Sequence, residues 1–127
     1  MELVWLNRED CLAIHEMMLS QHGGLAGVRD EGLLISALTK PQNLVAYGPP
    51  RLAELAAAYA VGIIHNDPFL DGNKRTGFML AAVFLELNGR EFKATEESVV
   101  EQTLALAAGQ TTTAQYAAWI EPNAPLR

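Results

Sequence analysis

The feature that most constrains the fold is an unbroken run of eight apolar residues, 78–85. A helix that faces solvent is apolar along one stripe only, so a helix that is apolar on every side must be covered by other elements. The run is too short to cross a bilayer, which takes about 20 residues. Asn88 and Gly89 follow it and would end a helix, because glycine readily adopts the C-cap conformation. We therefore expect a buried helix at the centre of a soluble fold.

The other long segments also repeat their apolar residues at helical spacing, and Gly, Pro, Asn or Asp separates one segment from the next. Asn7 is an expected N-cap, and Thr112 with Gln115 forms an expected capping box. Further helices are expected from Asn7 to the glycines at 23–24, over 30–38, from about 51 to before Pro68, over 96–108, and from 112 onward. The sequence thus predicts an all-α fold, a compact single-domain bundle of about six helices around a buried central helix, with one domain over residues 1–127.

Two segments are expected to lie outside the helices. Pro41 and the proline pair at 49–50 bracket a connection that contains the apolar tetrad 44–47, because proline disfavours continuation of a helix. The tetrad is either an extended flap that docks a target strand or a plain hydrophobic loop. The last residues, 121–127, contain prolines and are expected to fray.

Composition narrows the classes of function. At 127 residues, half of them hydrophobic, the chain can bury one core but not two. The formal net charge is −6 and the basic residues are scattered, which argues against direct nucleic-acid binding, because the phosphate backbone needs clustered cations. The single cysteine, Cys11, excludes an intrachain disulfide, and the N-terminus lacks the pattern of a signal peptide. We expect a cytoplasmic protein with no membrane attachment.

The segment between the third and fourth expected helices carries the chemistry. Gly72, directly before a helix N-terminus with free N–H groups, lets a phosphate approach the backbone. Lys74 and Arg75 lie in the first turn, where the helix dipole disfavours cations and an anionic ligand would reverse that cost. Asp71 is placed to hold Mg²⁺, which takes one or two carboxylates and completes its shell with phosphate and water. From the residues alone an ordinary turn stays open, with Asp71 or Asn73 as an N-cap and the two cations solvated.

Residues 67–75, Asp-Pro-Phe-Leu-Asp-Gly-Asn-Lys-Arg, resemble the Fic/Doc signature, H-x-F-x-[DN]-[AG]-N-[GK]-R, at every position except the first. Upstream, residues 23–34, 36–38 and Pro41 also resemble the Doc (death-on-curing) branch of the Fic superfamily, so the likeness covers nearly the whole chain. The resemblance implies the helical Fic/Doc fold, with Phe69 as the buried anchor of the motif loop.

The resemblance also implies a role for each motif residue. Asp71 would hold Mg²⁺, Gly72 and Asn73 would line the phosphate cradle, and Arg75 would clamp a phosphate with two hydrogen bonds. Lys74 stands where the AMP-transferring Fic enzymes have Gly. In Doc-like proteins this change accompanies delivery of the γ-phosphoryl group of ATP instead of AMP. Gly72, Asn73, Lys74 and Arg75 would thus bind the nucleotide.

By resemblance, then, the chain is a toxin of the protein Ser/Thr kinase type, with Asp67, Lys74 and Arg75 as catalytic residues and with ATP and Mg²⁺ as its requirements. Such toxins act on the translation machinery, with elongation factor Tu as the precedent. Fic proteins are often inhibited by a helix that carries [ST]-x-x-x-E-[GN], and this sequence has no such segment. The resemblance therefore implies inhibition by a separate antitoxin chain, whose helix we expect across the groove near Arg75.

Asp67 departs from the family pattern, because it occupies the position of the His that takes the proton from the target hydroxyl. An imidazole with a pKa of about 6.5 suits proton transfer at neutral pH, whereas a carboxylate near about 3.9 is a weaker base and adds negative charge beside a triphosphate. Three explanations stay open: an introduced inactivation that makes a lethal toxin expressible, a natural inactive relative, or a working Asp, as in protein kinases of another fold.

Two other functions compete: a catalytically dead Fic-fold module that binds nucleotide or antitoxin, and an AMP transferase, which Lys74 disfavours.

Three further side chains are not assigned to the site. His65 lies two positions before Asp67 and is expected to be a helix-end histidine with a hydrogen bond. His15 falls on the apolar stripe of the first helix and is expected to belong to the core. Cys11 shares that stripe and is expected to be a small buried hydrophobe rather than a nucleophile.

Overall fold

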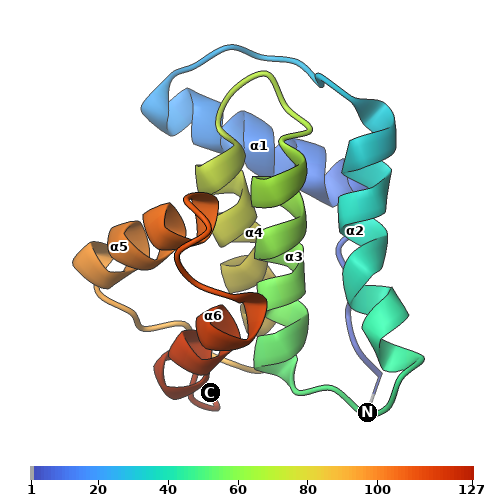
Figure 1. The fold of residues 1–127 in the computed structure, drawn as a ribbon, viewed down its shortest axis with the longest axis vertical. Coiled ribbons are helices and arrows are strands. Elements are labelled where there is room, and N and C mark those ends of the chain that lie inside the picture. Colours follow the sequence, from blue (N-terminus) through green and yellow to red (C-terminus); the bar gives the residue numbers. More distant parts are fainter. Residues whose placement is uncertain (1) are drawn as a thin grey trace.

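The computed structural model describes residues 2–127, and its regular structure is helical (Figure 1). The elements, in chain order, are α1 Arg8–His22, α2 Glu31–Val45, α3 Leu52–Asn66, α4 Asn73–Leu87, α5 Glu96–Ala107, α6 Thr113–Ile120 and the 3-10 turn η1 Glu121–Asn123. Within residues 2–127 no strand forms, and the extended pairings are two isolated bridges. The prediction of an all-α fold with six helices is confirmed.

Local sequence explains where most of these helices begin. In α1, α2, α5 and α6 the residue before the helix accepts a hydrogen bond from the backbone N–H three residues later, which satisfies a donor that the helix leaves free. The capping residues are Asn7, Asp30, Thr95 and Thr112. The predicted caps at Asn7 and Thr112 are therefore confirmed.

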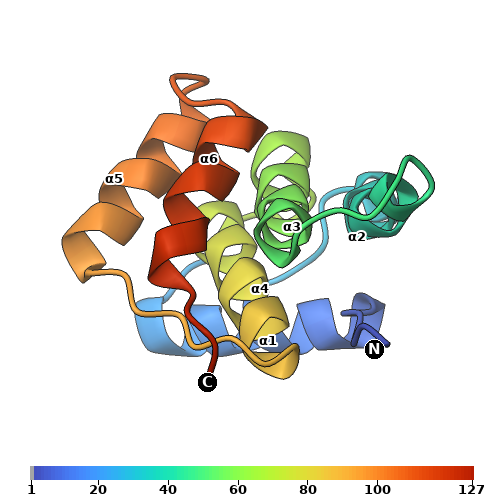
Figure 2. The ribbon, with the colours of Figure 1, turned by 90° about the horizontal axis from the view of Figure 1, so that it is seen from below.

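The centre of the bundle is the pair α3 and α4. Seen from below, α3 lies between α2 on one side and α6 on the other, and α1 crosses beneath α4 (Figure 2). The run 78–85 is helical and largely buried, as expected, but Phe78, Met79 and Val83 keep part of their surface exposed. In α3, by contrast, every residue from 55 to 64 is buried. The most enclosed helix is thus α3 and not, as predicted, α4.

Small side chains allow this close covering of α3. A Cβ added at Gly62 would lie 3.0 Å from the carbonyl oxygen of Ala37 in α2. A Cβ added at Gly77 of α4 would lie 3.0 Å from the carbonyl oxygen of Ala60. Glycine at both contacts lets the backbones of neighbouring helices meet at the density of a protein interior. The packing fixes the end of α3, from which the loop to α4 departs.

The connection after α2 is shorter than predicted. The helix continues through Pro41 to Val45, and Tyr47 N–H donates to the carbonyl oxygen of Leu44 at 3.1 Å, so the tetrad 44–47 is helix end and turn. Of the two alternatives, the extended flap is therefore wrong, and Leu44 and Val45 belong to α2 rather than to a loop. A proline inside a helix costs about 3 kcal/mol, and burial of the α2 face that includes Pro41 offsets that cost in this fold.

The C-terminal segment is held in place, so the prediction that 121–127 frays is also wrong. It runs beside residues 89–93, and Ala124 is 2% exposed. The carbonyl oxygen of Pro125 accepts from Glu91 N–H at 2.9 Å, and Arg127 N–H donates to the carbonyl oxygen of Gly89 at 3.1 Å. Backbone pairing of this kind outweighs the fraying that two prolines suggest.

Candidate functional site

The motif loop, residues 67–72, connects α3 to α4 and lies next to the α1–α2 loop, residues 23–30, at the top of the bundle (Figure 1). Leu70 N–H donates to the carbonyl oxygen of Gly27 at 3.1 Å, and Val28 and Phe69 form an antiparallel bridge. Two loops that are distant in sequence therefore support each other by backbone hydrogen bonds. These contacts hold the backbone of the motif loop in place.

Phe69 and Asn73 fix the shape of the motif loop. The Phe69 side chain is 1% exposed, which agrees with its expected position as a buried anchor. The Asn73 side chain holds both backbone groups of Phe69: its Oδ1 accepts from the N–H and its Nδ2 donates to the carbonyl oxygen, each at 3.0 Å. One of the two Nδ2 hydrogens is used in this way, so Asn73 keeps its backbone N–H and one side-chain donor for an anion.

The N-terminus of α4 has no side-chain cap. Gly72 occupies the N-cap position with φ +78°, so the interpretation of Asp71 or Asn73 as the N-cap is wrong. Thr76 N–H donates to the carbonyl oxygen of Gly72 at 3.0 Å. Within residues 2–127 the backbone N–H groups of residues 73, 74 and 75 donate no hydrogen bond. Such a terminus combines free donors with the positive end of the helix dipole.

Two cations lie at this same helix end. Lys74 and Arg75 are both exposed. The ion pairs among the described residues are Arg8–Glu31 and Lys93–Glu91, so no carboxylate neutralises Lys74 or Arg75 within residues 2–127. Cations at a helix N-terminus are unfavourable without an anion. The arrangement accordingly suits a phosphate.

The Asp71 carboxylate is oriented by backbone N–H groups. Its Oδ1 accepts from Gly72 N–H at 2.9 Å and its Oδ2 from Leu25 N–H at 3.2 Å. Gly24 permits this approach, since a Cβ there would lie 2.8 Å from Oδ2. Asp71 is exposed, and each of its oxygens keeps a lone pair for a further ligand. Among residues 2–127 no group of three or more His, Cys, Asp or Glu side chains is arranged to hold a metal ion.

Asp67 lies at the other end of the loop, as the C-cap of α3. Its φ of +53° is the one positive value of a non-glycine residue within residues 2–127. Asp tolerates this left-handed conformation better than most residues, because its short polar side chain interacts locally with the backbone. The residue is exposed, and its carboxylate makes no hydrogen bond to the described residues. An exposed, unpaired carboxylate thus stands at the start of the motif loop.

Three side chains were expected to lie outside the site, and two of them, His65 and Cys11, do so. His65 Nε2 lies 3.2 Å from the carbonyl oxygen of Leu106, which confirms a helix-end histidine with a hydrogen bond. Cys11 is fully buried, and this burial raises the pKa of its thiol to about 12, which confirms an unreactive core residue. His15 is buried as expected, yet it contacts the motif loop as well as the core.

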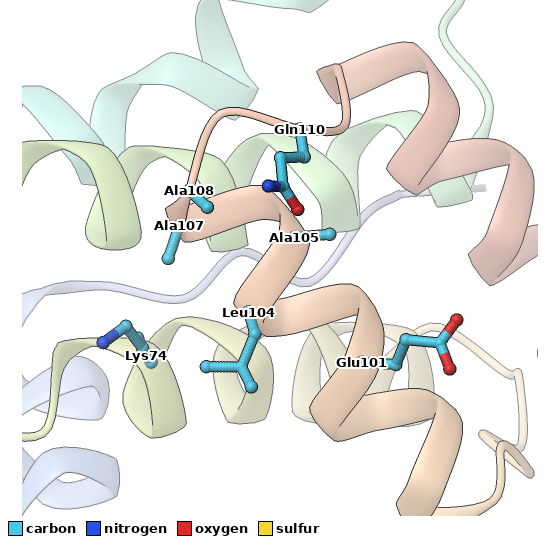
Figure 3. Close-up of a pocket in the computed structure, with 7 residues that line it drawn as sticks. All are labelled: Lys74, Glu101, Leu104, Ala105, Ala107, Ala108 and Gln110. Carbon is cyan, nitrogen blue, oxygen red and sulfur yellow. The ribbon is translucent and has the colours of Figure 1, made fainter.

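An open cleft of about 750 Å³ adjoins the α4 N-terminus. Lys74 borders it from α4, and Leu104 and Ala107 of α5 line it together with the C-cap residue Ala108 (Figure 3). Leu104 points from α5 toward α4, whereas Glu101 lies farther along α5 and its carboxylate points away from Lys74 (Figure 3). The cleft has room for a ligand that extends from the helix end along an apolar wall.

The profile of the Fic/DOC family matches residues 5–85, from the segment before α1 to the last turns of α4, with the motif loop included. The chain belongs to the Fic/DOC family. Over 93 residues it is 41% identical to Toxin Doc of Mycolicibacterium smegmatis, an overlap of 71% of this chain and 68% of that protein. Over 85 residues it is 35% identical to Protein kinase doc of Escherichia phage P1, an overlap of 66% of this chain and 68% of that protein. Both relatives agree with the Doc branch of the Fic superfamily.

As a Fic/DOC protein, the chain keeps five signature residues together in the loop and the first turn of α4, namely Asp71, Gly72, Asn73, Lys74 and Arg75. Asp67 begins the same loop, as the C-cap of α3. Each helix in the described part of the chain is too short or too polar to span a bilayer.

Sequence reasoning missed two residues that hold this Fic/DOC loop. Arg29 donates from Nε to the carbonyl oxygen of Asp67 at 2.7 Å and from Nη2 to that of Asn66 at 3.0 Å. The guanidinium therefore binds the C-terminal end of α3, where a cation is favourable. His15 is the second such residue. Both residues lie in the matched region 5–85. No pattern of residue types indicated their contacts, because their partners are backbone carbonyl oxygens far along the chain.

Proposed function

We propose that this chain is a Doc-type toxin that transfers the γ-phosphoryl group of ATP to a Ser or Thr hydroxyl of a translation factor, and that Asp67 weakens or abolishes the transfer. The observation that carries the proposal is the α4 N-terminus, where free N–H groups, Lys74 and Arg75 lie beside the oriented carboxylate of Asp71. The relatives named Toxin Doc and Protein kinase doc support the same activity. Elongation factor Tu is the target class that the family resemblance suggests.

The residues present fit a nucleotide with Mg²⁺. Arg75 would hold a phosphate with two hydrogen bonds, and Lys74 and the N–H groups at 73–75 would add further positive charge. Asp71 would be the protein ligand of Mg²⁺, which takes its other ligands from phosphate and water. When bound, the ion neutralises charge that develops on the phosphates. The cleft beside Lys74 would accept the remainder of the nucleotide.

The transfer forms a bond between the target Oγ and the γ-phosphorus and breaks the bond from that phosphorus to the β–γ bridging oxygen, so ADP leaves with that electron pair. The proton of the target hydroxyl must go to a base. Asp67 occupies the position of that base, and its carboxylate is free to accept the proton. A carboxylate is a weaker base than an imidazole near neutral pH, so the proposed rate is low.

A separate antitoxin would inhibit the protein by covering Lys74 and Arg75. The two cations have no acidic partner within residues 2–127, so an acidic side chain of a second chain could pair with them. Reversal of the Arg75 charge, Arg75→Glu, should then release a co-purified antitoxin. Retention of the antitoxin by that variant would contradict the shared site.

A binding module without catalysis is the second candidate function, and Asp67 is the observation that favours it. In that case the chain would bind ATP with Mg²⁺ or an antitoxin and transfer nothing. Transfer of AMP is the third possibility, which Lys74 disfavours by resemblance. The intact mass of the target separates all three, because phosphate and AMP add different masses and a binding module adds none.

Calorimetry of the whole chain with ATP and Mg²⁺ tests the proposed site. Binding should weaken strongly in Asp71→Ala, which removes the metal ligand, and in Arg75→Ala, which removes the phosphate clamp. Two exposed substitutions away from the loop, Glu86→Ala at the far end of α4 and Lys40→Ala on α2, are the matched controls and should bind as the parent does. Binding that survives both site substitutions unchanged would overturn the assignment.

A further inference from the structure

The imidazole of His15 is packed under the motif loop, although His15 lies outside the signature segment. It is 5% exposed. Its ring stacks on the Phe69 ring, with centroids 3.7 Å apart and planes 7° apart. Its Nε2 lies 2.8 Å from the carbonyl oxygen of Asp71, and a Cβ added at Gly72 would lie 3.6 Å from the same nitrogen. One side chain of α1 thus contacts Phe69 and Asp71 of the loop and lies beside Gly72.

The contact with Asp71 defines the state of the ring nitrogen. A backbone carbonyl oxygen only accepts, so Nε2 carries the hydrogen and donates it. The donor is buried, and removal of a buried donor leaves its acceptor without a partner. The stack on Phe69 fixes the plane of the same ring, and Phe69 is itself held by Asn73. The imidazole therefore has one defined orientation against the loop.

We propose that His15 is a positioning residue that fixes the main chain at Asp71 and so directs its carboxylate toward Mg²⁺. The inference rests on the proposed function. The N–H groups of Leu25 and Gly72 hold the Asp71 side chain, whereas His15 holds its backbone. Removal of a hydrogen bond that orients a metal ligand typically costs about 10–100-fold in metal affinity or activity. Sequence reasoning placed His15 in the core, and the structure adds this second role.

Three variants of the whole chain test the proposal. His15→Phe keeps a ring that can stack on Phe69 but has no donor, and His15→Gln keeps an N–H donor without the ring. Ile14→Val is the matched control, because it removes one methyl group from the neighbouring buried position of α1. Calorimetry measures ATP binding as Mg²⁺ is titrated and again in EDTA. Thermal unfolding reports stability.

His15→Phe should raise the Mg²⁺ concentration for half-maximal ATP binding about tenfold or more, with binding in EDTA unchanged. His15→Gln should recover part of the loss, and Ile14→Val should keep the Mg²⁺ requirement of the parent. A purely structural role would weaken binding in the same proportion with and without Mg²⁺, and that result would overturn the proposal. An unchanged Mg²⁺ requirement in His15→Phe would overturn it as well, while leaving the proposed function in place. A parent chain that binds no ATP with Mg²⁺ would overturn the proposed function first, and this role with it.

Discussion

Gly24 lies against the carboxylate assigned to Mg²⁺, so Gly24→Ala should damage the site through a single added carbon. The φ of Gly24 is +124°, a region that costs a residue with a Cβ about 1–3 kcal/mol. The new Cβ would lie 2.8 Å from Asp71 Oδ2 and 3.0 Å from Leu19 Cδ2. Either the carboxylate turns away or the loop retreats. In both cases the hydrogen bond from Leu25 N–H to Oδ2, 3.2 Å in the parent, is lost.

Gly23→Ala is the control for Gly24→Ala. Gly23 also has a positive φ, +79°, but a Cβ there would have no neighbour within 4 Å. Both variants should lower the free energy of unfolding in urea by about 1–3 kcal/mol, because both strain the backbone. Gly24→Ala alone should weaken Mg²⁺-dependent ATP binding, by about tenfold. Equal ATP affinities in the two variants would refute the argument that the α1–α2 loop sets the position of the Asp71 carboxylate.

Two further predictions concern the scaffold. Arg29→Ala should lower the free energy of unfolding by about 1 kcal/mol in urea denaturation, because the guanidinium binds the last carbonyls of α3. Arg29→Lys should recover part of this loss. An unchanged free energy of unfolding in Arg29→Ala would contradict the capping role. Burial raises the pKa of Cys11 from 9.0 to about 12, so the folded state keeps a proton that the unfolded state loses above pH 9. The free energy of unfolding of the parent relative to Cys11→Ala should therefore decrease between pH 9 and pH 12, by up to about 1.4 kcal/mol per pH unit. A difference between the two proteins that stays constant over this range would disprove the raised pKa of Cys11.

The helix boundaries were predictable where local chemistry decides them. Asn7 and Thr112 cap their helices through contacts within three residues, and the end of α3 before Pro68 follows from the steric demands of proline. Such signals are complete within a short stretch of sequence. They need no knowledge of the rest of the fold.

Tertiary packing overrode the local signals elsewhere. Pro41 predicts a break, but its buried face lets α2 continue through it. The prolines of 121–127 suggest fraying, but pairing with residues 89–93 holds the segment. The small size of the alanines and the glycine of α3 is the reason that several helices can cover it, but residue size does not indicate which helices do so. These outcomes depend on partners that a local pattern does not contain.

The candidate site, too, could be predicted from the sequence only in part. Residues 71–75 are consecutive and their types imply an anion site, so they could be found from the sequence. Asn73 illustrates the limit, because the position was predictable while its use in holding Phe69 was not. His15 and Arg29 donate hydrogen bonds to backbone carbonyl oxygens far along the chain. Because every residue has such an oxygen, residue types do not indicate which one accepts.

The most direct test of the central claim is the rate of target phosphorylation in the parent and in Asp67→His, measured with labelled ATP, Mg²⁺ and purified elongation factor Tu. The residues proposed to bind phosphate and Mg²⁺ lie together at the start of α4, so the imidazole of Asp67→His should raise the rate by about 10²–10⁴. Induction of Asp67→His should also arrest growth, and induction of the parent should not. A parent that phosphorylates its target as fast as the His variant would show that Asp67 is a competent base. Silence of both chains would contradict phosphoryl transfer to this target and favour the binding module.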